Sequence, residues 1–253
     1  MSNVTYDFTG ERFVVTGASS GMGRQIAVEL AEAGATVLAI ARRVERLAEL
    51  EQQYPGKIVP GVIDVCDSEK LSEAIKLFVA QHGKLHGAVH AAGIGASTPL
   101  RAYDEKKARA VMDVSFWSGI RLMHIVNKKK ISMPGCSSIL FSSVAAHIGE
   151  KSFFAYSAAK AALQIAVRAL AKEIYPNGNR INTIAPGWVE TEMTQWADET
   201  GTTAPKMFDR YLFGTGKVQD VSGMVLFLLS DRASWITGED FVVDGGYLMG
   251  GYN

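Results

Sequence analysis

Three residues in the middle of the chain have the types and spacing needed for proton transfer: Ser143, Tyr156 and Lys160. Tyr156 and Lys160 stand four positions apart, so on a helix they share one face. A free tyrosine is a poor acid at neutral pH, but a lysine beside it favours the phenolate and lowers its pKa. The pair could then exchange a proton with an oxygen atom, to which Ser143 could donate a hydrogen bond. The alternative at this spacing is a packed ring beside a solvated charge.

A glycine-rich turn near the N-terminus predicts a nucleotide site. Gly17, Gly21 and Gly23 separate a β-branched run at 12–16 from a helical pattern at 21–33, and a second apolar run follows at 36–41. This is the βαβ context that a dinucleotide fingerprint requires. Gly17 would permit the tight turn, Gly21 the approach of a pyrophosphate, and Gly23 close packing of the helix on the sheet. The helix N-terminus would supply free N–H groups to the phosphates.

The end of the second predicted strand indicates which dinucleotide binds. An NAD site has an acidic residue here for the ribose 2′-hydroxyl, but this strand ends in Ala41-Arg42-Arg43. An arginine can grip a 2′-phosphate through charge-assisted hydrogen bonds, so the sequence predicts NADP(H). Arg42 is the preferred ligand and Arg43 the second, with Ser19 and Ser20 as further hydroxyl contacts. The alternative is that the arginines only begin an exposed helix.

Composition narrows the class of protein. The chain has 253 residues, which suits one α/β domain over 1–253. Its 26 basic and 26 acidic residues balance, so neither nucleic acid nor an anionic membrane is expected as a partner. The apolar runs are too short to span a bilayer, and the first residues lack a signal pattern, so we expect a cytoplasmic protein.

No metal site is expected. Cys66 and Cys136 have no metal-ligand spacing and suggest no disulfide framework. His82, His86 and His90 are spaced by four, but glycines interrupt the series, and His90 falls at a strand end while His82 closes a helix. These histidines are therefore not expected to converge.

Strand-like runs alternate with helical patterns along the chain. We predict an α/β fold: one Rossmann-type, doubly wound domain with a seven-stranded, mostly parallel sheet and helices on both faces. The strands are expected near 12–16, 36–41, 58–63, 87–91, 138–142, 180–184 and 240–243. The helices are expected near 21–33, 43–53, 67–82, 104–130, 153–175 and 219–230.

The irregular stretch at about 191–218 is predicted to be a substrate loop. Large apolar side chains gather in and around it and indicate a substrate with an apolar or ring portion, unless they only pack the loop onto the body. They are Trp188, Met193, Trp196, Met207, Phe208, Tyr211, Leu212 and Phe213.

Taken together, the motifs resemble those of the short-chain dehydrogenase/reductases, in the shorter single-domain subclass, over essentially the whole chain. The Tyr156–Lys160 pair also lacks the methionine-spaced pattern of an enoyl reductase. The motifs that carry the resemblance are Thr16-Gly17-x-x-x-Gly21-x-Gly23, Asp64-Val65, Ala91-Ala92-Gly93, Ser143, Tyr156-x-x-x-Lys160, Pro186-Gly187-x-Val189-x-Thr191 and Asp244-Gly245-Gly246.

The resemblance implies a role for each catalytic candidate. Tyr156 would be the general acid/base, and Ser143 would polarise the substrate carbonyl. Lys160 would bind the nicotinamide ribose and lower the tyrosine pKa. The cofactor-binding set would be Gly17, Ser19, Ser20, Gly21, Met22, Gly23, Arg42, Arg43, Asp64, Val65, Ala91, Ala92, Gly93, Tyr156, Lys160, Pro186, Gly187, Val189 and Thr191.

The chain departs from the family pattern twice. The family's Asn-Asn-Ala-Gly is His90-Ala91-Ala92-Gly93 here, and the small residues still allow close approach of a cofactor. The family's helix asparagine, 41 residues before the tyrosine, is Ser115. That asparagine holds a water of the proton relay, and a serine hydroxyl can also donate and accept, so we expect activity to survive with a rearranged relay.

The resulting hypothesis is an NADP(H)-dependent oxidoreductase that interconverts a carbonyl and a secondary alcohol on a small molecule. The alternative is a catalytically weak NADP(H)-binding sensor or scaffold of the same fold, which only Ser115 favours. The alanine-rich helix at 153–175 carries apolar residues on more than one face, which predicts subunit packing. The family forms homodimers and tetramers through that helix.

Overall fold

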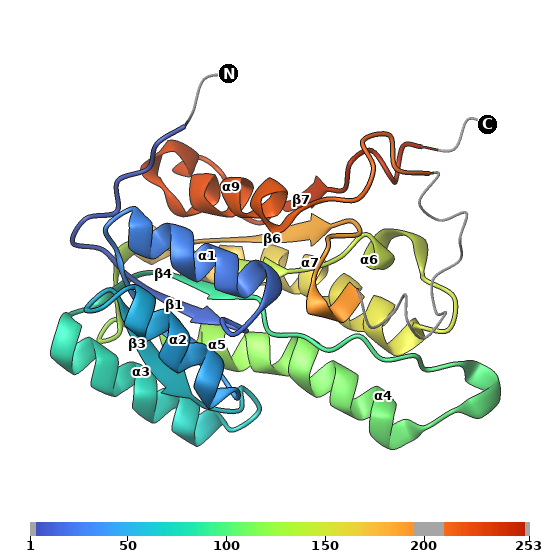
Figure 1. Ribbon diagram of the computed structural model, residues 1–253, viewed down its shortest axis with the longest axis horizontal. Coiled ribbons are helices and arrows are strands. Elements are labelled where there is room, and N and C mark those ends of the chain that lie inside the picture. The colour runs from blue at the N-terminus through green and yellow to red at the C-terminus, as the bar shows by residue number, and fades with distance from the viewer. Residues whose placement is uncertain (1–3, 195–209, 251–253) are drawn as a thin grey trace.

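The fold is a single parallel sheet covered by helices on both sides. The computed structural model describes residues 4–194 and 210–250. Seven strands lie in the order β3-β2-β1-β4-β5-β6-β7, and every neighbouring pair runs parallel (Figure 1). The predicted sheet is thus confirmed, and it is parallel throughout. The strands are β1 Arg12–Thr16, β2 Thr36–Ala41, β3 Ile58–Val62, β4 Leu85–His90, β5 Ser132–Phe141, β6 Arg180–Pro186 and β7 Asp240–Val243.

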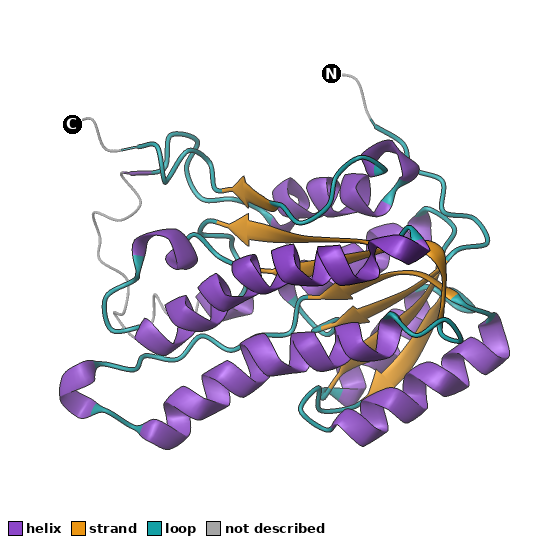
Figure 2. Ribbon diagram, turned by 180° about the vertical axis from the view of Figure 1, so that it is seen from behind, coloured by secondary structure: helices purple, strands orange, loops and turns teal. Residues whose placement is uncertain are grey.

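Two apolar layers hold the helices to the sheet, and the two opposite views show helices on both sides of it (Figures 1 and 2). One layer joins the sheet to α1 (Gly21–Glu32), α2 (Val44–Gln53) and α9 (Val218–Leu229). The other joins it to α3 (Ser68–His82), α5 (Ser118–Val126) and α7 (Phe154–Ile174). Within β1, Val15 packs in the first layer and Val14 in the second, because side chains alternate along a strand. Burial on both faces explains why the central strands read as continuous apolar runs.

The helix predicted at 104–130 is divided. It comprises α4 (Glu105–Met112), a π-helical turn at Asp113–Trp117, and α5, which ends at Val126. The hydroxyl of Ser118, the first residue of α5, donates to the Val114 carbonyl in the turn at 2.6 Å. The side chain of Asn127 donates to the carbonyl of Met123 at 2.9 Å and helps to end the helix. The lysines at 128–130 therefore follow the helix and do not extend it.

Strand β5 begins at Ser132, six residues before its predicted start. Its pairing with β4 shifts register between Leu85 and Gly87, which accommodates Pro134 and Gly135. The short helix α6 (Ala145–Ile148) follows the strand and was not predicted. Residues 195–209 of the predicted substrate loop lie outside the described residues. Within residues 4–194 and 210–250, no helix has the length and apolar character needed to cross a membrane.

The strand order reverses between the neighbours β1 and β4. The chain passes from β1 to β2 on one side and from β4 to β5 on the other. Ligands of open α/β sheets bind at the carboxyl ends of strands where the strand order reverses in this way. The fold therefore places the glycine turn after β1 and the Ala91–Gly93 segment after β4 at the expected ligand position.

Candidate active site

The glycine turn is packed too tightly for side chains. Gly17 has φ +71°, and a Cβ on it would lie 2.8 Å from the backbone nitrogen of Ala92. A Cβ on Gly23 would lie 2.5 Å from the Gly17 carbonyl oxygen. Both glycines are therefore needed to bring the β1 turn, the start of α1 and the segment after β4 together. This leaves the first N–H groups of α1 facing the end of the sheet, as a phosphate site requires.

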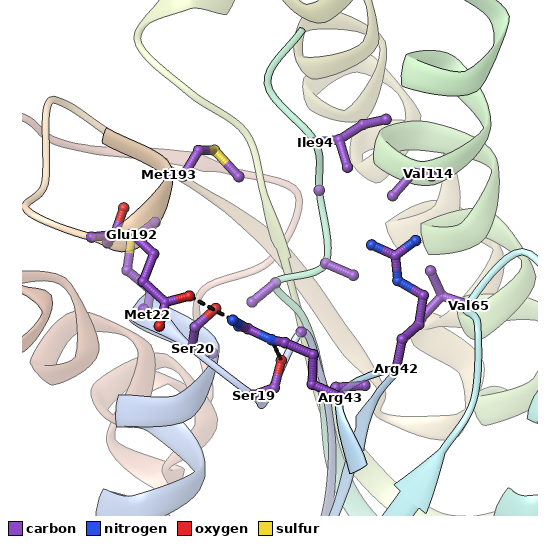
Figure 3. A pocket seen from close by; sticks show the side chains of 18 of the residues that line it. Ser19, Ser20, Met22, Arg42, Arg43, Val65, Ile94, Val114, Glu192 and Met193 are labelled. Carbon is purple, nitrogen blue, oxygen red and sulfur yellow. Dashed lines mark hydrogen bonds and ion pairs between the residues drawn. The ribbon is translucent and has the colours of Figure 1, made fainter. Parts of the chain in front are cut away.

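A cleft of about 570 Å³ opens at this end of the sheet. It brings together most of the residues predicted to bind the cofactor (Figure 3). The lining residues are Gly17, Ser19, Ser20, Gly21, Met22, Gly23, Ala41, Arg42, Arg43, Ile63, Asp64, Val65, Ala91, Ala92, Gly93, Ile94, Ala110, Val114, Thr191, Glu192 and Met193.

The two arginines of the cleft point in different directions (Figure 3). Arg43 reaches the glycine turn, where its Nε donates to the Ser19 hydroxyl at 3.1 Å. Its guanidinium also pairs with Glu192 at 2.6 Å. Arg42 is exposed and directs its guanidinium towards the side of the cleft formed by Val65 and Val114. Both arginines thus border the cleft, together with Ser19 and Ser20.

The end of β5 and helix α7 hold the three proton-transfer candidates. Lys160 is only 4% exposed, and its Nζ donates to the Phe141 carbonyl at 2.6 Å. Its own carbonyl accepts from the Ser142 hydroxyl at 3.2 Å, which ties the strand end to the helix. The lysine Nζ lies 5.6 Å from the centre of the Tyr156 ring. The predicted pair therefore shares one face of a helix, beside the Ser143 segment.

The expectation that Lys160 lowers the pKa of Tyr156 is not met in the protein alone. Burial raises the pKa of the Tyr156 phenol above its ordinary value, and a hydrogen bond from Ser143 partly offsets this. Burial also lowers the pKa of Lys160 to about 8. The reason is that the lysine ammonium is directed to the Phe141 carbonyl rather than to the phenol oxygen. A neutral phenol is a proton donor, so this state suits an acid.

Ser115 faces the same place from the π-helical turn. It is fully buried, and its hydroxyl has no hydrogen-bond partner within the described chain. A Cβ built on Gly93 would lie 3.7 Å from the Ser115 oxygen and 3.5 Å from the Lys160 Nζ. These three residues thus converge from three elements. An unpaired buried hydroxyl beside a buried ammonium is a site where a water molecule can complete both sets of hydrogen bonds.

His90, the departure after β4, sits in a buried network beside this turn. Its ring nitrogens lie 2.9 Å from the Thr16 hydroxyl and 3.0 Å from the Ser118 hydroxyl. Because the Ser118 hydroxyl donates to Val114, it accepts from Nε2–H, and Nδ1 accepts from Thr16. Burial lowers the pKa of His90 to about 3, so the ring is neutral. His86 instead contacts Arg12, and His82 packs on Phe78, so the three histidines have separate environments.

Pro186, Gly187 and Val189 lie at the end of β6 and do not line the cleft. The Pro186 carbonyl accepts from the Val144 N–H at 3.1 Å, which holds this segment against the Ser143 loop. The predicted substrate-side residues have varied surroundings. Tyr211 is buried and stacks on Tyr247, whereas Leu212 and Phe213 are exposed. Trp196, Met207 and Phe208 lie outside the described residues.

Comparison with known proteins identifies the relatives of this fold and site. A family model described as enoyl-(acyl carrier protein) reductase matches residues 17–248. The L-xylulose reductase of Caenorhabditis elegans is 34% identical over 249 residues, covering 96% of this chain and 97% of the relative. The chain belongs to the short-chain dehydrogenase/reductases. Members of this family are nicotinamide-dependent oxidoreductases, and the chain shares that general activity.

Two further short-chain dehydrogenase/reductases match over nearly their whole length. Carbonyl reductase [NADPH] 2 of Sus scrofa is 31% identical over 245 residues, covering 96% of this chain and 98% of the relative. The crystal structure of a protein titled short-chain dehydrogenase/reductase SDR:glucose/ribitol dehydrogenase, from Brucella melitensis, has a TM-score of 0.90 and 26% identity. The match covers 96% of this chain and 99% of the chain in that structure. The family predicted from the motifs is therefore confirmed.

Sequence reasoning missed the part that Glu192 plays in the cleft. It lies 149 positions after Arg43, and no local pattern marks the contact. Its position directly after Thr191 was the only available signal. Met193 was expected on the substrate side, yet its side chain also lines this cleft.

Proposed function

We propose that the protein is an NADP(H)-dependent reductase or dehydrogenase that interconverts a carbonyl and a secondary alcohol. The convergence of Ser143, Tyr156 and Lys160 beside a cleft with a glycine turn carries this proposal. The carbonyl reductase from Sus scrofa, which carries NADPH in its name, supports the same cofactor and reaction.

The chain's own residues fit a dinucleotide with a 2′-phosphate. The glycine turn and the start of α1 would hold the pyrophosphate. Arg42, Arg43 and the hydroxyls of Ser19 and Ser20 would hold the 2′-phosphate, because no acidic residue ends β2. Asp64 and Val65 would border the adenine, and Ala91 to Gly93 the ribose. When bound, the nicotinamide supplies or accepts the hydride.

In the reducing direction, the neutral phenol of Tyr156 donates its proton to the carbonyl oxygen as negative charge develops there. The Ser143 hydroxyl donates a hydrogen bond to the same oxygen and stabilises that charge. Lys160, while charged, stabilises the phenolate that remains. Ser115 and Lys160 would then hold the water through which Tyr156 regains its proton. In the oxidising direction the phenolate accepts the alcohol proton.

Replacement of Tyr156 by phenylalanine tests the mechanism. The variant should lose about 10²- to 10⁴-fold in turnover, the contribution usual for a positioned acid or base. NADPH binding, measured by fluorescence titration, should change little, because the ring remains. Turnover close to that of the wild type would exclude Tyr156 as the acid.

A substrate panel assayed by cofactor absorbance tests the reaction class. It should include sugar ketones, aromatic ketones, a 3-oxoacyl thioester and an enoyl thioester, since the matching family model is described as an enoyl reductase. We expect consumption of NADPH with one or more ketones and none with the enoyl thioester. Binding of NADPH without turnover of any compound would favour a sensor or scaffold.

A further inference from the structure

A segment at residues 190–194, here named the strap, crosses the mouth of the cleft. Thr191 packs beside the glycine turn, because a Cβ on Gly21 would lie 3.2 Å from its methyl carbon. Met193 reaches the opposite side, with its sulfur 3.5 Å from the position of a Cβ on Gly95. Glu192 lies between them. The strap therefore touches both sides of the space in which the cofactor would lie.

Glu192 fixes the strap to the arginines that follow β2. Its carboxylate pairs with Arg43 at 2.6 Å and with Arg46 at 3.5 Å (Figure 3 shows the Arg43 contact). The hydrogen bond from Arg43 also lowers the pKa of Glu192, so the carboxylate is charged at neutral pH. The same Arg43 donates to the hydroxyl of Ser19 through its Nε, while Nη1 donates to Glu192.

A 2′-phosphate and a glutamate carboxylate can bind the same arginine guanidinium. Both are oxyanions that accept charge-assisted hydrogen bonds from a guanidinium. They also repel each other when held close together. Glu192 is half exposed, so its ion pairs are weak enough for a doubly charged phosphate to displace them.

We propose that Glu192 is an internal competitor for the 2′-phosphate of the cofactor, and that it limits the preference for the phosphorylated dinucleotide over the unphosphorylated one. Glu192 holds Arg43 and Arg46 in the free protein. Binding of a 2′-phosphate takes over Arg43, and the strap loses its ion pair with that residue. This inference rests on the proposed use of NADP(H). It predicts that the strap moves when NADP(H) binds and moves less when NAD(H) binds.

The test compares Glu192→Gln with the wild type in binding experiments on the intact protein. The probes are adenosine 2′,5′-bisphosphate and 5′-AMP, measured by calorimetry, and NADPH and NADH, measured by fluorescence. Removing the competing charge should tighten bisphosphate and NADPH binding about three- to tenfold, because the pairs that are lost are exposed. Binding of AMP and NADH should change less than about twofold, since they lack the phosphate that competes.

Glu190→Gln is the matched control. Glu190 lies on the same strap, but its carboxylate accepts from the Thr215 hydroxyl at 2.8 Å and contacts no arginine within the described residues. The control removes the same charge and should leave all four affinities near those of the wild type. Equal tightening in both variants would mean a general charge effect and would overturn the proposal.

Arg43→Gln completes a double-mutant cycle. In that background Glu192→Gln should tighten bisphosphate binding less than it does in the wild type. The guanidinium for which the carboxylate and the phosphate compete is then absent. An unchanged effect would assign the competition to another group. An unaltered bisphosphate affinity in Glu192→Gln alone would also reject the competition.

These outcomes separate the inference from the proposed function. If the wild type binds NADPH and reduces no carbonyl, while Glu192→Gln still tightens bisphosphate binding, the proposed reaction fails and the competition stands. If carbonyl reduction with NADPH is found but Glu192→Gln binds all probes as the wild type does, the competition fails and the reaction stands.

Discussion

At the scale of single residues, the burial of the Lys160 ammonium predicts how activity depends on pH. Burial lowers its pKa to about 8, and the pKa of Tyr156 is raised above its ordinary value. As pH rises, Lys160 therefore loses its proton before Tyr156 does. The value of kcat/KM for carbonyl reduction reports groups of the free enzyme. It should fall as pH rises through about 8.

The measurement is a pH profile of kcat/KM, with circular dichroism at each pH to confirm that the protein remains folded. Loss of the Lys160 charge removes the group that stabilises the phenolate, so the decline should be roughly tenfold per pH unit once it is established. A profile that stays level until the tyrosine itself titrates would show that Lys160 keeps its proton throughout.

Ser115 makes a second prediction, in which stability and activity separate. Its hydroxyl is buried and has no hydrogen-bond partner within the described chain, so its removal breaks no hydrogen bond between protein groups. Ser115→Ala should therefore leave the free energy of unfolding unchanged or raise it, while turnover falls because a relay position is lost. Denaturant unfolding and steady-state turnover measure the two effects.

Ser118→Ala is the control for this experiment. Ser118 occupies the neighbouring turn, but its hydroxyl contacts both His90 and the Val114 carbonyl, so its loss should destabilise the fold. Full turnover in Ser115→Ala would remove Ser115 from the relay, and the serine at this position would then have no catalytic part.

At the scale of elements, His90 joins β1, β4 and the turn before α5. It bonds to Thr16 and Ser118, and its pKa is lowered from 6.5 to about 3 by burial. In the unfolded chain the same ring takes up a proton as pH falls below 6.5. The unfolded state then binds more protons than the native one, so stability falls with pH, by up to about 1.4 kcal/mol per unit.

His90→Asn tests this directly. Asparagine is the residue usual in the family at this position, and it does not titrate. The variant should lose about 1–3 kcal/mol at neutral pH, where one hydroxyl is left without its partner. The difference in the free energy of unfolding between the variant and the wild type should shrink as pH falls below 6.5. Only the wild type loses stability from protonation of His90 in the unfolded chain. Parallel pH dependences in the two proteins would contradict the buried neutral ring.

The elements also mark the limit of what the sequence could predict. Strands such as β1 and β2 were predicted to the residue, because a buried parallel strand is a continuous apolar run between turn residues. The π-helical turn at Asp113–Trp117 was missed, since no break in the periodic pattern marked it. The Arg43–Glu192 contact was missed because only the fold brings the two residues together.

For the site, the sequence predicted the positions of residues better than their protonation chemistry. Residues in local motifs, such as Gly17 and Gly23, were placed correctly at the end of the sheet. The direction of the Tyr156 pKa was not, because spacing along a helix says nothing about which acceptor a lysine reaches. In the fold, that acceptor is the Phe141 carbonyl at the end of β5.

At the scale of the whole molecule, the outer side of α7 has no cover within the described residues. Its inner residues pack on the sheet, while Phe154, Ala158, Ile165 and Ala169 form an exposed stripe along the helix. The sequence predicted subunit packing from apolar residues on more than one face of this helix. The described chain covers the face towards the sheet and also the face at Ala155, which packs on α4. Ile165 is 65% exposed and Phe154 43% exposed. A stripe of this composition on a helix of 21 residues is unusual unless another surface covers it.

We expect a second copy of the chain to cover this stripe. The small side chains of Ala158 and Ala169 would allow two helices to approach closely, and Ile165 between them would lie at the contact. Ile165→Asp should then lower the mass measured by light scattering from that of a dimer or tetramer, because a carboxylate would be buried in an apolar interface.

Leu77→Asp, on α3, is the matched control, since Leu77 is 60% exposed and lies far along the chain from the stripe. It should leave the mass unchanged. A wild-type protein that is monomeric at micromolar concentration would contradict the expectation, and the apolar stripe would then be a surface of the single chain.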